Sequence, residues 1–268
     1  MKDDLGKRMK EQYEMRTRTF LPRRTYTIIR LDGKAFHTFT RGMERPYDKK
    51  FMNMMDVTAK FLLNEIQGAK LAYVQSDEIS LLLTDFDKIT TNAWFDGQVQ
   101  KMVSVSASLA TAKFNKLILS NFIKDKFDCG ITNVTYRYME NFEELSMAFF
   151  DARVFTIPDP VEVENYFIWR QKDAIRNSIS MHAQSLYSHK ELHGKSQEDM
   201  LKMIEEKGKR WEMNDLGFQY GRTFHTLQGK PEKSFSIFTD KMKVGTFGEP
   251  GCIEQRVITQ FIPKISYE

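Results

Sequence analysis

The 268-residue sequence predicts an α+β fold. We expect a ferredoxin-like, split βαβ antiparallel sheet with helices on one face, followed by a C-terminal helical lobe with a small hairpin. Segments with strand and helix periodicity alternate in the order β-α-β-β-α-β as far as Pro158. Beyond Pro158 the pattern becomes mainly helical, so residues 1–158 are expected to form a core and residues 159–268 a lobe that packs on it as one compact unit.

The first part of the core contains one predicted strand and one predicted helix. Residues 25–31, TYTIIRL, are rich in β-branched and aromatic side chains, which predicts a strand that stops at Asp32-Gly33. Apolar residues then recur at helical intervals over residues 48–66, and Gly68 closes that helix. The apolar stripe consists of Phe51, Met55, Ala59, Leu62 and Ile66.

A hairpin over residues 71–84 and a long helix over residues 98–123 come next. The helix begins with many small residues, SVSASLATA, which allow close packing on a sheet. Residues 146–157, SMAFFDARVFTI, predict a further strand, which Pro158 stops. In the split βαβ order, the first and third strands are neighbours at the centre of the sheet.

The lobe begins with a favourable helix start. An Asp-Pro pair at residues 159–160 supplies a cap and a first helical position, which predicts a helix over residues 160–187. Ser196 and Asp199 resemble a capping box and predict a helix over residues 197–207. The tail, with the basic-aromatic stretch QYGRTFHTLQGK and the β-rich stretch IEQRVITQFI, is expected to form the small hairpin.

The composition is that of an ordinary globular protein, with 41% hydrophobic and 28% charged residues and a net charge of +4. That charge permits a nucleic-acid partner without requiring one. The only cysteines, Cys129 and Cys252, form no CxxC pair, which argues against a zinc ribbon and favours a reducing compartment. The charged start MKDDLGKRMK and the absence of a long apolar run predict a cytoplasmic protein without a secretory signal or membrane span.

Adjacent acids interrupt the hairpin LAYVQSDEISLLL. Its polar centre ends in Asp77 and Glu78, whereas tight hairpins usually contain glycine. Asp32 ends the first strand, so the predicted strand order brings Asp32 and Asp77 together. Converging carboxylates suit Mg²⁺, which prefers oxygen ligands, and two such ions can support an in-line displacement at phosphorus. The alternative is that each acid is a solvated turn residue.

Phosphate groups require positive charge and backbone N–H groups. The sequence DGKAFH offers a turn at Gly33 and backbone amides as far as His37. Five cationic residues are within plausible reach of a phosphate there, although Lys101 could equally be a lysine on a helix surface. They are Arg30, Lys34, Arg41, Arg45 and Lys101.

Four spaced stretches, RLDGKAFHTF, YVQSDEIS, FDARVFTIP and WRQKDAIRNSI, occur in an order that resembles the histidine tRNA guanylyltransferase family. The stretches SHKELHGKS and WEMNDLGFQYGR are similar to the guanylyltransferase-like branch of that family. The resemblance extends from about residue 25 to about residue 230. It implies a palm-type catalytic core and 3′–5′ polymerase activity.

The resemblance also implies roles for individual residues. Asp32 and Asp77 match the metal-binding aspartates, with the Gly33 carbonyl as a further ligand, and Glu78 matches an acid that supports them. Arg45 stands where the family often has lysine, which keeps the charge but changes the hydrogen-bond geometry. The residues expected near the nucleotide are Arg30, Lys34, Ala35, Phe36, His37, Arg45, Asp48, Ser76 and Lys101.

The implied reaction adds nucleotides to the 5′ end of a tRNA, including a truncated one, under the direction of the opposite strand. A 5′-monophosphate is first activated with ATP, which releases pyrophosphate. The 3′-hydroxyl of GTP or another nucleoside triphosphate then attacks the activated phosphate, with Mg²⁺ as cofactor. The resemblance further implies a homotetramer, assembled as a dimer of dimers. A nucleotide cyclase-like palm enzyme and a non-catalytic tRNA-binding protein are the alternatives.

Asn177 and a set of charged residues in and after the motif WRQKDAIRNSI are expected to contact tRNA, although any one of the charged residues could be an ordinary surface charge. Eukaryotic relatives carry HINN at the positions that here read Ile175-Arg176-Asn177-Ser178, so a broad range of tRNA substrates is expected. The candidate tRNA contacts are Arg170, Lys172, Arg176, Asn177, Lys190, Lys195, Lys209, Arg210 and Arg222.

Overall fold

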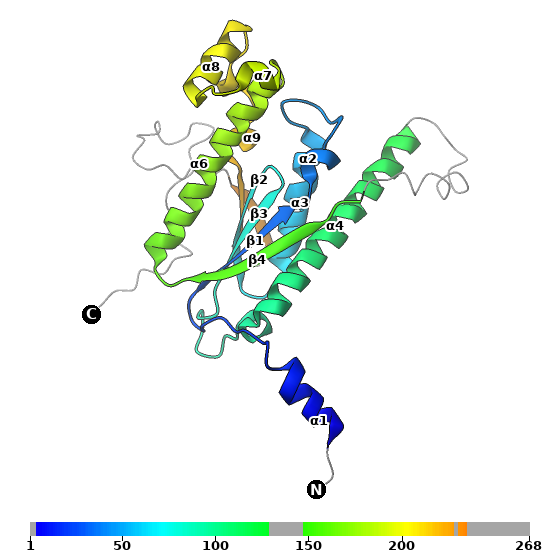
Figure 1. The fold of residues 1–268 in the computed structure, drawn as a ribbon, viewed down its shortest axis with the longest axis vertical. Helices are drawn as coiled ribbons and strands as arrows, with labels where there is room; N and C mark the ends of the chain where they lie inside the picture. Colours follow the sequence, from blue (N-terminus) through cyan, green and yellow to red (C-terminus); the bar gives the residue numbers. More distant parts are fainter. Residues whose placement is uncertain (1–3, 129–146, 228–229, 235–268) are drawn as a thin grey trace.

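A computed structural model describes residues 4–128, 147–227 and 230–234. Its centre is a six-stranded antiparallel sheet with the strand order β4-β1-β3-β2-β5-β6 (Figure 1). The strands are β1 (Tyr26–Gly33), β2 (Ala69–Gln75), β3 (Glu78–Leu83), β4 (Phe150–Ile157), β5 (Arg222–Leu227) and β6 (Lys230–Ser234). The central position of β1 and β3 confirms the predicted split βαβ arrangement.

Helices surround this sheet on both sides (Figure 1). The longer ones are α3 (Lys49–Glu65), α4 (Val99–Asp128), α6 (Pro160–Gln184) and α8 (Gln197–Glu206). Shorter helical segments are α1 (Leu5–Met9), α2 (Phe36–Phe39), α7 (His189–Leu192) and α9 (Leu216–Tyr220). The remaining short helices are the π-helix η1 (Lys10–Glu14) and the 3-10 helices η2 (Trp94–Gly97) and η4 (Trp211–Met213).

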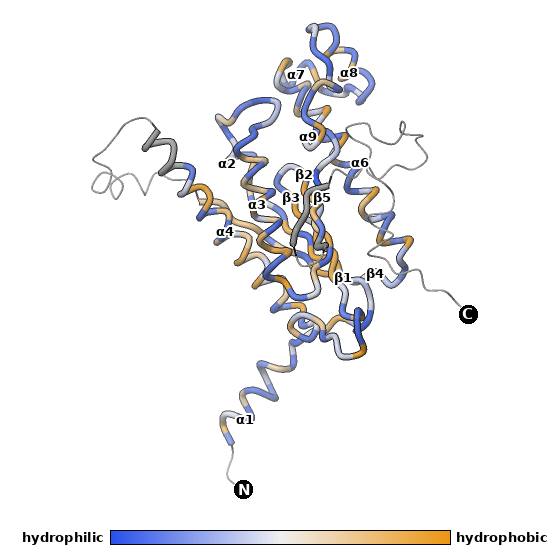
Figure 2. The backbone as a smooth tube through the Cα atoms, turned by 180° about the vertical axis from the view of Figure 1, so that it is seen from behind, coloured by the Kyte–Doolittle hydropathy of each residue, from blue (hydrophilic) through white to orange (hydrophobic). Residues whose placement is uncertain are grey.

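The helices α3 and α4 cover one face of the sheet, as the sequence predicts. The side chain of Asp48 caps α3 by accepting a hydrogen bond from the Phe51 N–H, and all five residues of the predicted apolar stripe are buried. Phe114 of α4 lies at the centre of an aromatic cluster with Phe36, Phe51 and Phe150. Hydrophobic residues dominate the strands and the helix stretches next to them (Figure 2).

The opposite face of the sheet is covered by α6. Val163, Tyr166 and Phe167 of α6 pack against Ile28 and neighbouring strand residues in a second, smaller apolar cluster. The sheet is therefore enclosed between the two core helices and the first helix of the lobe. Because α6 continues past the end of the strands, its second half stands beside the hairpin of β2 and β3 (Figure 1).

The segment that follows α6 contributes to both the lobe and the sheet. Ser196 and Asp199 form the predicted capping box at the start of α8. The strand β5 pairs with β2, so the small hairpin of β5 and β6 extends the central sheet. The β-rich stretch 253–262 and both cysteines lie outside the described residues, and the division at residues 158 and 159 stays a prediction.

No helix in the described ranges is long and apolar enough to cross a membrane.

Candidate active site

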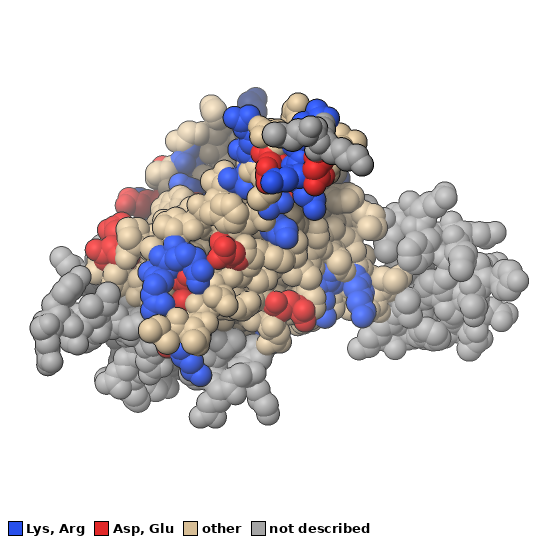
Figure 3. Space-filling model, turned by 90° about the horizontal axis from the view of Figure 1, so that it is seen from below, with Lys and Arg blue, Asp and Glu red and all other residues tan. Residues whose placement is uncertain are grey.

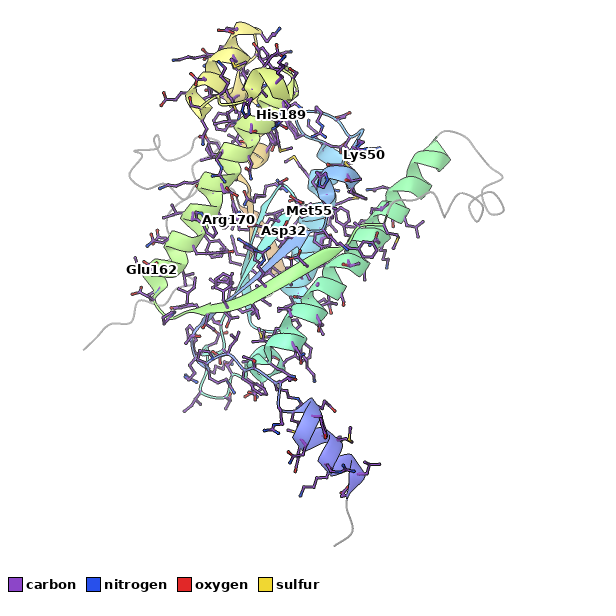
Figure 4. The ribbon with its side chains drawn as sticks, in the orientation of Figure 1. Asp32, Lys50, Met55, Glu162, Arg170 and His189 are labelled. Atoms are coloured by element: carbon purple, nitrogen blue, oxygen red, sulfur yellow. The ribbon has the colours of Figure 1, made fainter. Side chains whose placement is uncertain are left out.

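The turn between β2 and β3 brings the predicted aspartates together. Its two residues are Ser76, which adopts a left-handed backbone with φ of 45°, and Asp77. The Gly33 N–H donates to the Asp77 carbonyl over 3.1 Å, which ties the turn to the end of β1. Asp32 lies near this end of β1, between Arg170 of α6 and Met55 of α3 (Figure 4). The sheet therefore places Asp32 and Asp77 at the same end of its strands.

The two neighbouring carboxylates at this end of the sheet favour a bound cation. Burial, and to a smaller extent the charge of Asp32, raises the pKa of Asp77 to about 6. Mg²⁺ is commonly held by one or two carboxylates together with substrate phosphates and water. No cluster of three His, Cys, Asp or Glu side chains suited to a metal occurs in the part of the chain that is described. The pair Asp32 and Asp77 thus fits a substrate-assisted magnesium site.

The predicted supporting acid, Glu78, is bound within the protein. Its carboxylate accepts two hydrogen bonds from Arg170, at 2.8 and 2.9 Å, and Arg170 also donates to Asp173 over 2.8 Å. Glu78 is only 8% exposed and Arg170 only 5%. We therefore correct the expectation of a surface contact for Arg170, because its guanidinium is engaged by one buried and one partly buried acid and positions the hairpin. It nevertheless lines the second pocket described below.

A second predicted RNA contact, Arg222, is also inside the protein. It is 2% exposed, pairs with Asp56 of α3, and donates to the Gly217 carbonyl over 3.0 Å. This position likewise needs correction, since its guanidinium group does not reach the outer surface. Residue spacing gave no sign of either ion pair, because both partners lie far apart in the sequence.

A first pocket of about 450 Å³ opens beside the turn. It lies among α2, the loop before α3, the second half of α6, and α9. Tyr47 and Phe218, which the sequence reasoning missed, stack in its wall with ring centroids 4.7 Å apart. Of the residues predicted to contact nucleotide, the following line this pocket: Ala35, Phe36, His37, Arg45, Asp48 and Ser76.

The predicted phosphate-binding turn forms one wall of the first pocket. Ala35 has a left-handed backbone with φ of 56°, and the Lys34 N–H donates to the Phe149 carbonyl over 2.8 Å. The side chain of Phe36 belongs to the apolar core, so only its backbone is available to a ligand. His37 is exposed at the pocket, where its ring can meet an anion.

A second pocket of about 580 Å³ lies between the sheet and α6. Arg30 and Asp32 form part of its floor, and Trp169 and Arg176 part of its wall. Arg153, which the sequence reasoning missed, also lines it and stands opposite Arg30 in the register of β1 and β4. Asp77 lines both pockets, together with Gln75 and Ser76, so the turn separates two adjoining cavities.

Lys101 is not close to either pocket. It lies in the first turn of α4, with its ammonium group 5.6 Å from the ring centroid of Phe95. Its neighbour Met102 shares a small cavity with Thr27, which lies at the opposite end of β1 from Asp32. The expectation that Lys101 lies near the triphosphate of its own chain is therefore wrong. The reason is that α4 starts at the end of the sheet opposite Asp32.

The other predicted tRNA contacts lie on or near the lobe. Asn177 lines both pockets, and Arg176 is 62% exposed and pairs with Asp173, as the alternative interpretation anticipated. The exposed cations are Lys172, Lys190, Lys195, Lys209 and Arg210. On the underside of the molecule, in contrast, Lys and Arg are interspersed with Asp and Glu (Figure 3).

Known proteins resemble this chain in sequence and in structure. An uncharacterized protein, R259, of Acanthamoeba polyphaga mimivirus is 31% identical over 264 residues, which cover 90% of this chain and 86% of that protein. A bacterial tRNA(His) guanylyltransferase (Thg1)-like protein in complex with ATP matches with a TM-score of 0.73 and 40% identity, over 86% of this chain and 91% of that one. The corresponding structure in complex with GTP gives 0.66 and 37%, over 87% and 90%.

Curated tRNA(His) guanylyltransferases match a shorter region of this chain. The tRNA(His) guanylyltransferase of Schizosaccharomyces pombe is 32% identical over 171 residues, which span 63% of this chain but only 56% of that enzyme. The sequence profile of the family Thg1, tRNAHis guanylyltransferase, matches residues 6–158, which is more than half of the chain and includes Asp32 and Asp77. With the paired aspartates, the split βαβ sheet and these matches, the chain belongs to the Thg1 family.

Proposed function

We propose that this protein is a magnesium-dependent 3′–5′ nucleotidyltransferase that adds nucleotides to the 5′ end of tRNA. The observation that carries the proposal is the pair of pockets that meet at Asp77, with Asp32 in the second pocket. Two reactants must approach one reacting phosphorus, and two cavities that share a carboxylate turn provide for that approach. A non-catalytic RNA-binding protein would not need such an arrangement.

The first pocket is the proposed site of the nucleoside triphosphate. A similar bacterial protein has been solved in complex with ATP and with GTP, which supports nucleotide binding by this chain. Aromatic side chains such as Phe218 suit a base, while the turn from Gly33 to His37 suits phosphates. Arg45 adds a cation to the same pocket.

The residues that would hold Mg²⁺ are Asp32, Asp77 and the carbonyl of Gly33. When bound, the ion would lower the pKa of an attacking hydroxyl and neutralise charge that develops on the phosphate oxygens. The protein's own residues orient the reactants. Glu78 and Arg170 form a rigid pair beside Asp77, and that pair fixes the hairpin against α6. No side chain is required as a covalent nucleophile.

The second pocket is the proposed site of the RNA 5′ end. Its arginines, Arg30 and Arg153, face the same cavity as Asp32 and can balance the charge of a 5′-phosphate. The exposed cations of the lobe would bind the phosphate backbone farther along the tRNA. The resemblance implies that Ile175 and Arg176 stand where eukaryotic relatives carry residues that help to select histidine tRNA, so we propose that several tRNAs are substrates.

Extension of 5′-truncated tRNAs tests this function. A panel of 5′-monophosphorylated tRNAs with different bases opposite the gap would be incubated with Mg²⁺, ATP and each nucleoside triphosphate in turn. Addition of the nucleotide complementary to the opposing base, in several tRNAs, is the expected result. Extension of histidine tRNA alone, always with G, would contradict the broad range.

The cyclase alternative calls for a separate reaction. Labelled ATP or GTP would be incubated with the protein and Mg²⁺ without RNA, and the products would be separated by chromatography. We expect no cyclic nucleotide, and a cyclic product would favour the alternative. Unchanged tRNA in every extension assay would instead indicate a binding protein. The homotetramer remains a proposal that rests on the resemblance, and light scattering would test it. The cytoplasmic location remains a proposal that rests on the charged start and the cysteine content of the sequence.

A further inference from the structure

An exposed tryptophan stands in the wall of the second pocket. Trp169 of α6 is 53% exposed, although tryptophan is highly buried on average in folded proteins. Among the described residues that line this pocket, only Trp169 and Met181 are hydrophobic, and the others are polar or charged. The pocket therefore presents one large aromatic surface in an otherwise polar cavity.

The indole ring of Trp169 is held in place by its neighbours. The guanidinium carbon of Arg170 lies over the ring, 4.3 Å from its centroid, and Tyr166 contacts it edge to face with the centroids 5.9 Å apart. Arg170 is itself fixed by its two hydrogen bonds to Glu78. Because Arg170 covers one face of the ring and the residue is still more than half exposed, the opposite face is open to a ligand.

Cations that can bind a phosphate stand close to this ring. The guanidinium carbon of Arg30 is 6.0 Å from the ring centroid, and Arg153 stands opposite Arg30 in the register of β1 and β4. Both arginines line the same pocket as Asp32. Proteins that hold nucleic-acid strands combine cations for the backbone with aromatic side chains on which bases stack. A nucleotide whose phosphate lies at Arg30 can thus place its base on the open face of Trp169.

We propose that Trp169 stacks on the base of the 5′-terminal nucleotide of the RNA and thereby positions the 5′-phosphate beside Asp32 and Asp77. Stacking requires only the flat face of a base, so this contact accepts any base and is compatible with several tRNA substrates. The inference rests on the proposed function to the extent that it assumes an RNA 5′ end in the second pocket. It goes further by naming the residue and the part of the nucleotide that it holds.

Removal of the base from the terminal nucleotide tests the contact. Two 5′-monophosphorylated, 5′-truncated tRNAs would be compared, one with its ordinary 5′-terminal nucleotide and one with an abasic nucleotide there. Their affinities would be measured by filter binding with Mg²⁺ and without any nucleoside triphosphate. We expect the wild-type protein to bind the abasic tRNA about tenfold more weakly, which is within the range for one base stacked on an aromatic side chain.

The protein side of the test uses two variants of the tryptophan. Trp169→Leu removes the aromatic surface and should bind both tRNAs equally, whereas Trp169→Phe keeps an aromatic ring and should retain most of the preference. If Trp169→Leu does not fold, Trp169→Gln should also lose the preference. A purely structural role for Trp169 would weaken the binding of both tRNAs by the same factor and leave their ratio unchanged.

Two further measurements sharpen this comparison. The salt dependence of tRNA binding should be the same in Trp169→Leu and the wild type, because a stacked base releases no counterions. The matched control is Phe20→Leu, which should keep the full preference. Phe20 is 51% exposed, but it pairs with Gln98 just before α4 and lines neither pocket.

Three results would overturn the inference. Equal binding of both tRNAs to the wild type would mean that the terminal base makes no contact with the protein, and a preference that survives in Trp169→Leu would assign the contact to another residue. If Trp169→Leu weakened the binding of ATP in calorimetry and left tRNA binding unchanged, the ring would hold the base of a nucleoside triphosphate instead. Failure of the proposed function is distinguishable: binding with a preference for the base but no extension of any tRNA would refute only that function. Extension without this preference would refute only the role of Trp169.

Discussion

The two faces of the central sheet differ in how they are held to their helices. The face toward α3 and α4 is covered by a large apolar cluster in which Phe114 and its aromatic neighbours interdigitate. The face toward α6 has a small apolar cluster at one end and buried polar contacts at the other. There Glu78 pairs with Arg170, and the Ser80 and Tyr166 hydroxyls share a hydrogen bond of 2.8 Å.

This difference separates the part of the molecule that stabilises the fold from the part that positions the site. A buried ion pair costs desolvation and is weak evidence for stability. The polar end of the α6 face nevertheless lies directly beneath the turn that carries Asp77, because Glu78 follows Asp77 in the chain. We infer that Glu78 and Arg170 serve mainly to fix that turn, while Phe114 and its neighbours hold the fold together.

The largest expected effect is on catalysis. Asp32→Ala and Asp77→Ala should each lower nucleotide addition by about 10³-fold, the loss found when a group that stabilises charge at a reacting centre is removed. Neither variant should be less stable than the wild type, since the two carboxylates repel each other in the absence of metal. Single-turnover extension of a truncated tRNA and urea unfolding would measure the two effects.

The matched control for these variants is Asp151→Ala. Asp151 stands opposite Asp32 in the register of β1 and β4 but lines neither pocket. We expect its loss to leave addition within a few-fold of the wild type. Near-normal activity of Asp32→Ala at saturating Mg²⁺ would remove that residue from the proposed metal site.

The second prediction concerns removal of the ion pair between Glu78 and Arg170 at the polar end of the α6 face. Arg170→Met should lower the free energy of unfolding by about 3–5 kcal/mol, because it leaves Glu78 charged and unpaired in the interior. The double variant Glu78→Leu/Arg170→Met should regain most of that stability and remain impaired in nucleotide addition. Urea unfolding and the extension assay, applied to the same samples, would separate the two properties.

The opposite face supplies the contrast for this cycle. Phe114→Ala should also cost about 3–5 kcal/mol, but no second substitution of a polar partner can rescue it, because the loss comes from a cavity. If the Glu78→Leu/Arg170→Met variant were as unstable as Arg170→Met, the ion pair would have to be counted as part of the stabilising core. The distinction between the two faces would then fail.

The sequence predicted the fold more completely than the site. Periodicity identified α3 because its apolar stripe packs on a sheet, and the strand order brought Asp32 and Asp77 together. Local patterns carry no information about partners that are distant in the chain. Arg170 and Arg222 therefore read as surface cations, although each pairs with an acid on a different element. Lys101 was misplaced because the direction in which α4 crosses the sheet decides which end meets the active site.

The third prediction concerns pH. The pKa of Asp77 is raised from an ordinary 3.8 to about 6, mainly by burial, so the folded state binds a proton more tightly than the unfolded state. The stability that this proton contributes is complete below about pH 4 and is lost as pH rises through about 6. Without metal, Asp77→Asn should therefore gain about 2–3 kcal/mol relative to the wild type between pH 4 and pH 7.

Urea unfolding in the presence of a chelator, at pH 4.5 and at pH 7, would measure this difference for the wild type and for Asp77→Asn. Addition of Mg²⁺ at pH 7 should stabilise the wild type but not the variant. A constant difference between the two proteins across this pH range would show that Asp77 keeps an ordinary pKa and is better solvated than its position indicates.

The smallest effects on stability are expected at the exposed cations of the lobe. Lys190, Lys195 and Lys209 are all exposed, in contrast to the buried arginines Arg170 and Arg222. Substitution of each lysine by Gln should change the free energy of unfolding by less than about 0.5 kcal/mol, as is usual at the surface. The logarithm of the affinity falls as the logarithm of the salt concentration rises. If these lysines contact tRNA phosphates, each variant should make this negative slope shallower by about 0.9.

Filter binding of a tRNA at several salt concentrations would measure these slopes, with Lys116→Gln on the exposed side of α4 as the control. Lys116 is also exposed but lies on the helix that covers the other face of the sheet. A reduced slope for the lobe lysines, and an unchanged one for Lys116, would place the RNA on the α6 side of the molecule, with its 5′ end directed toward the second pocket. Equal slopes in all four variants would mean that the backbone of the tRNA follows another surface, even if the active site is as described.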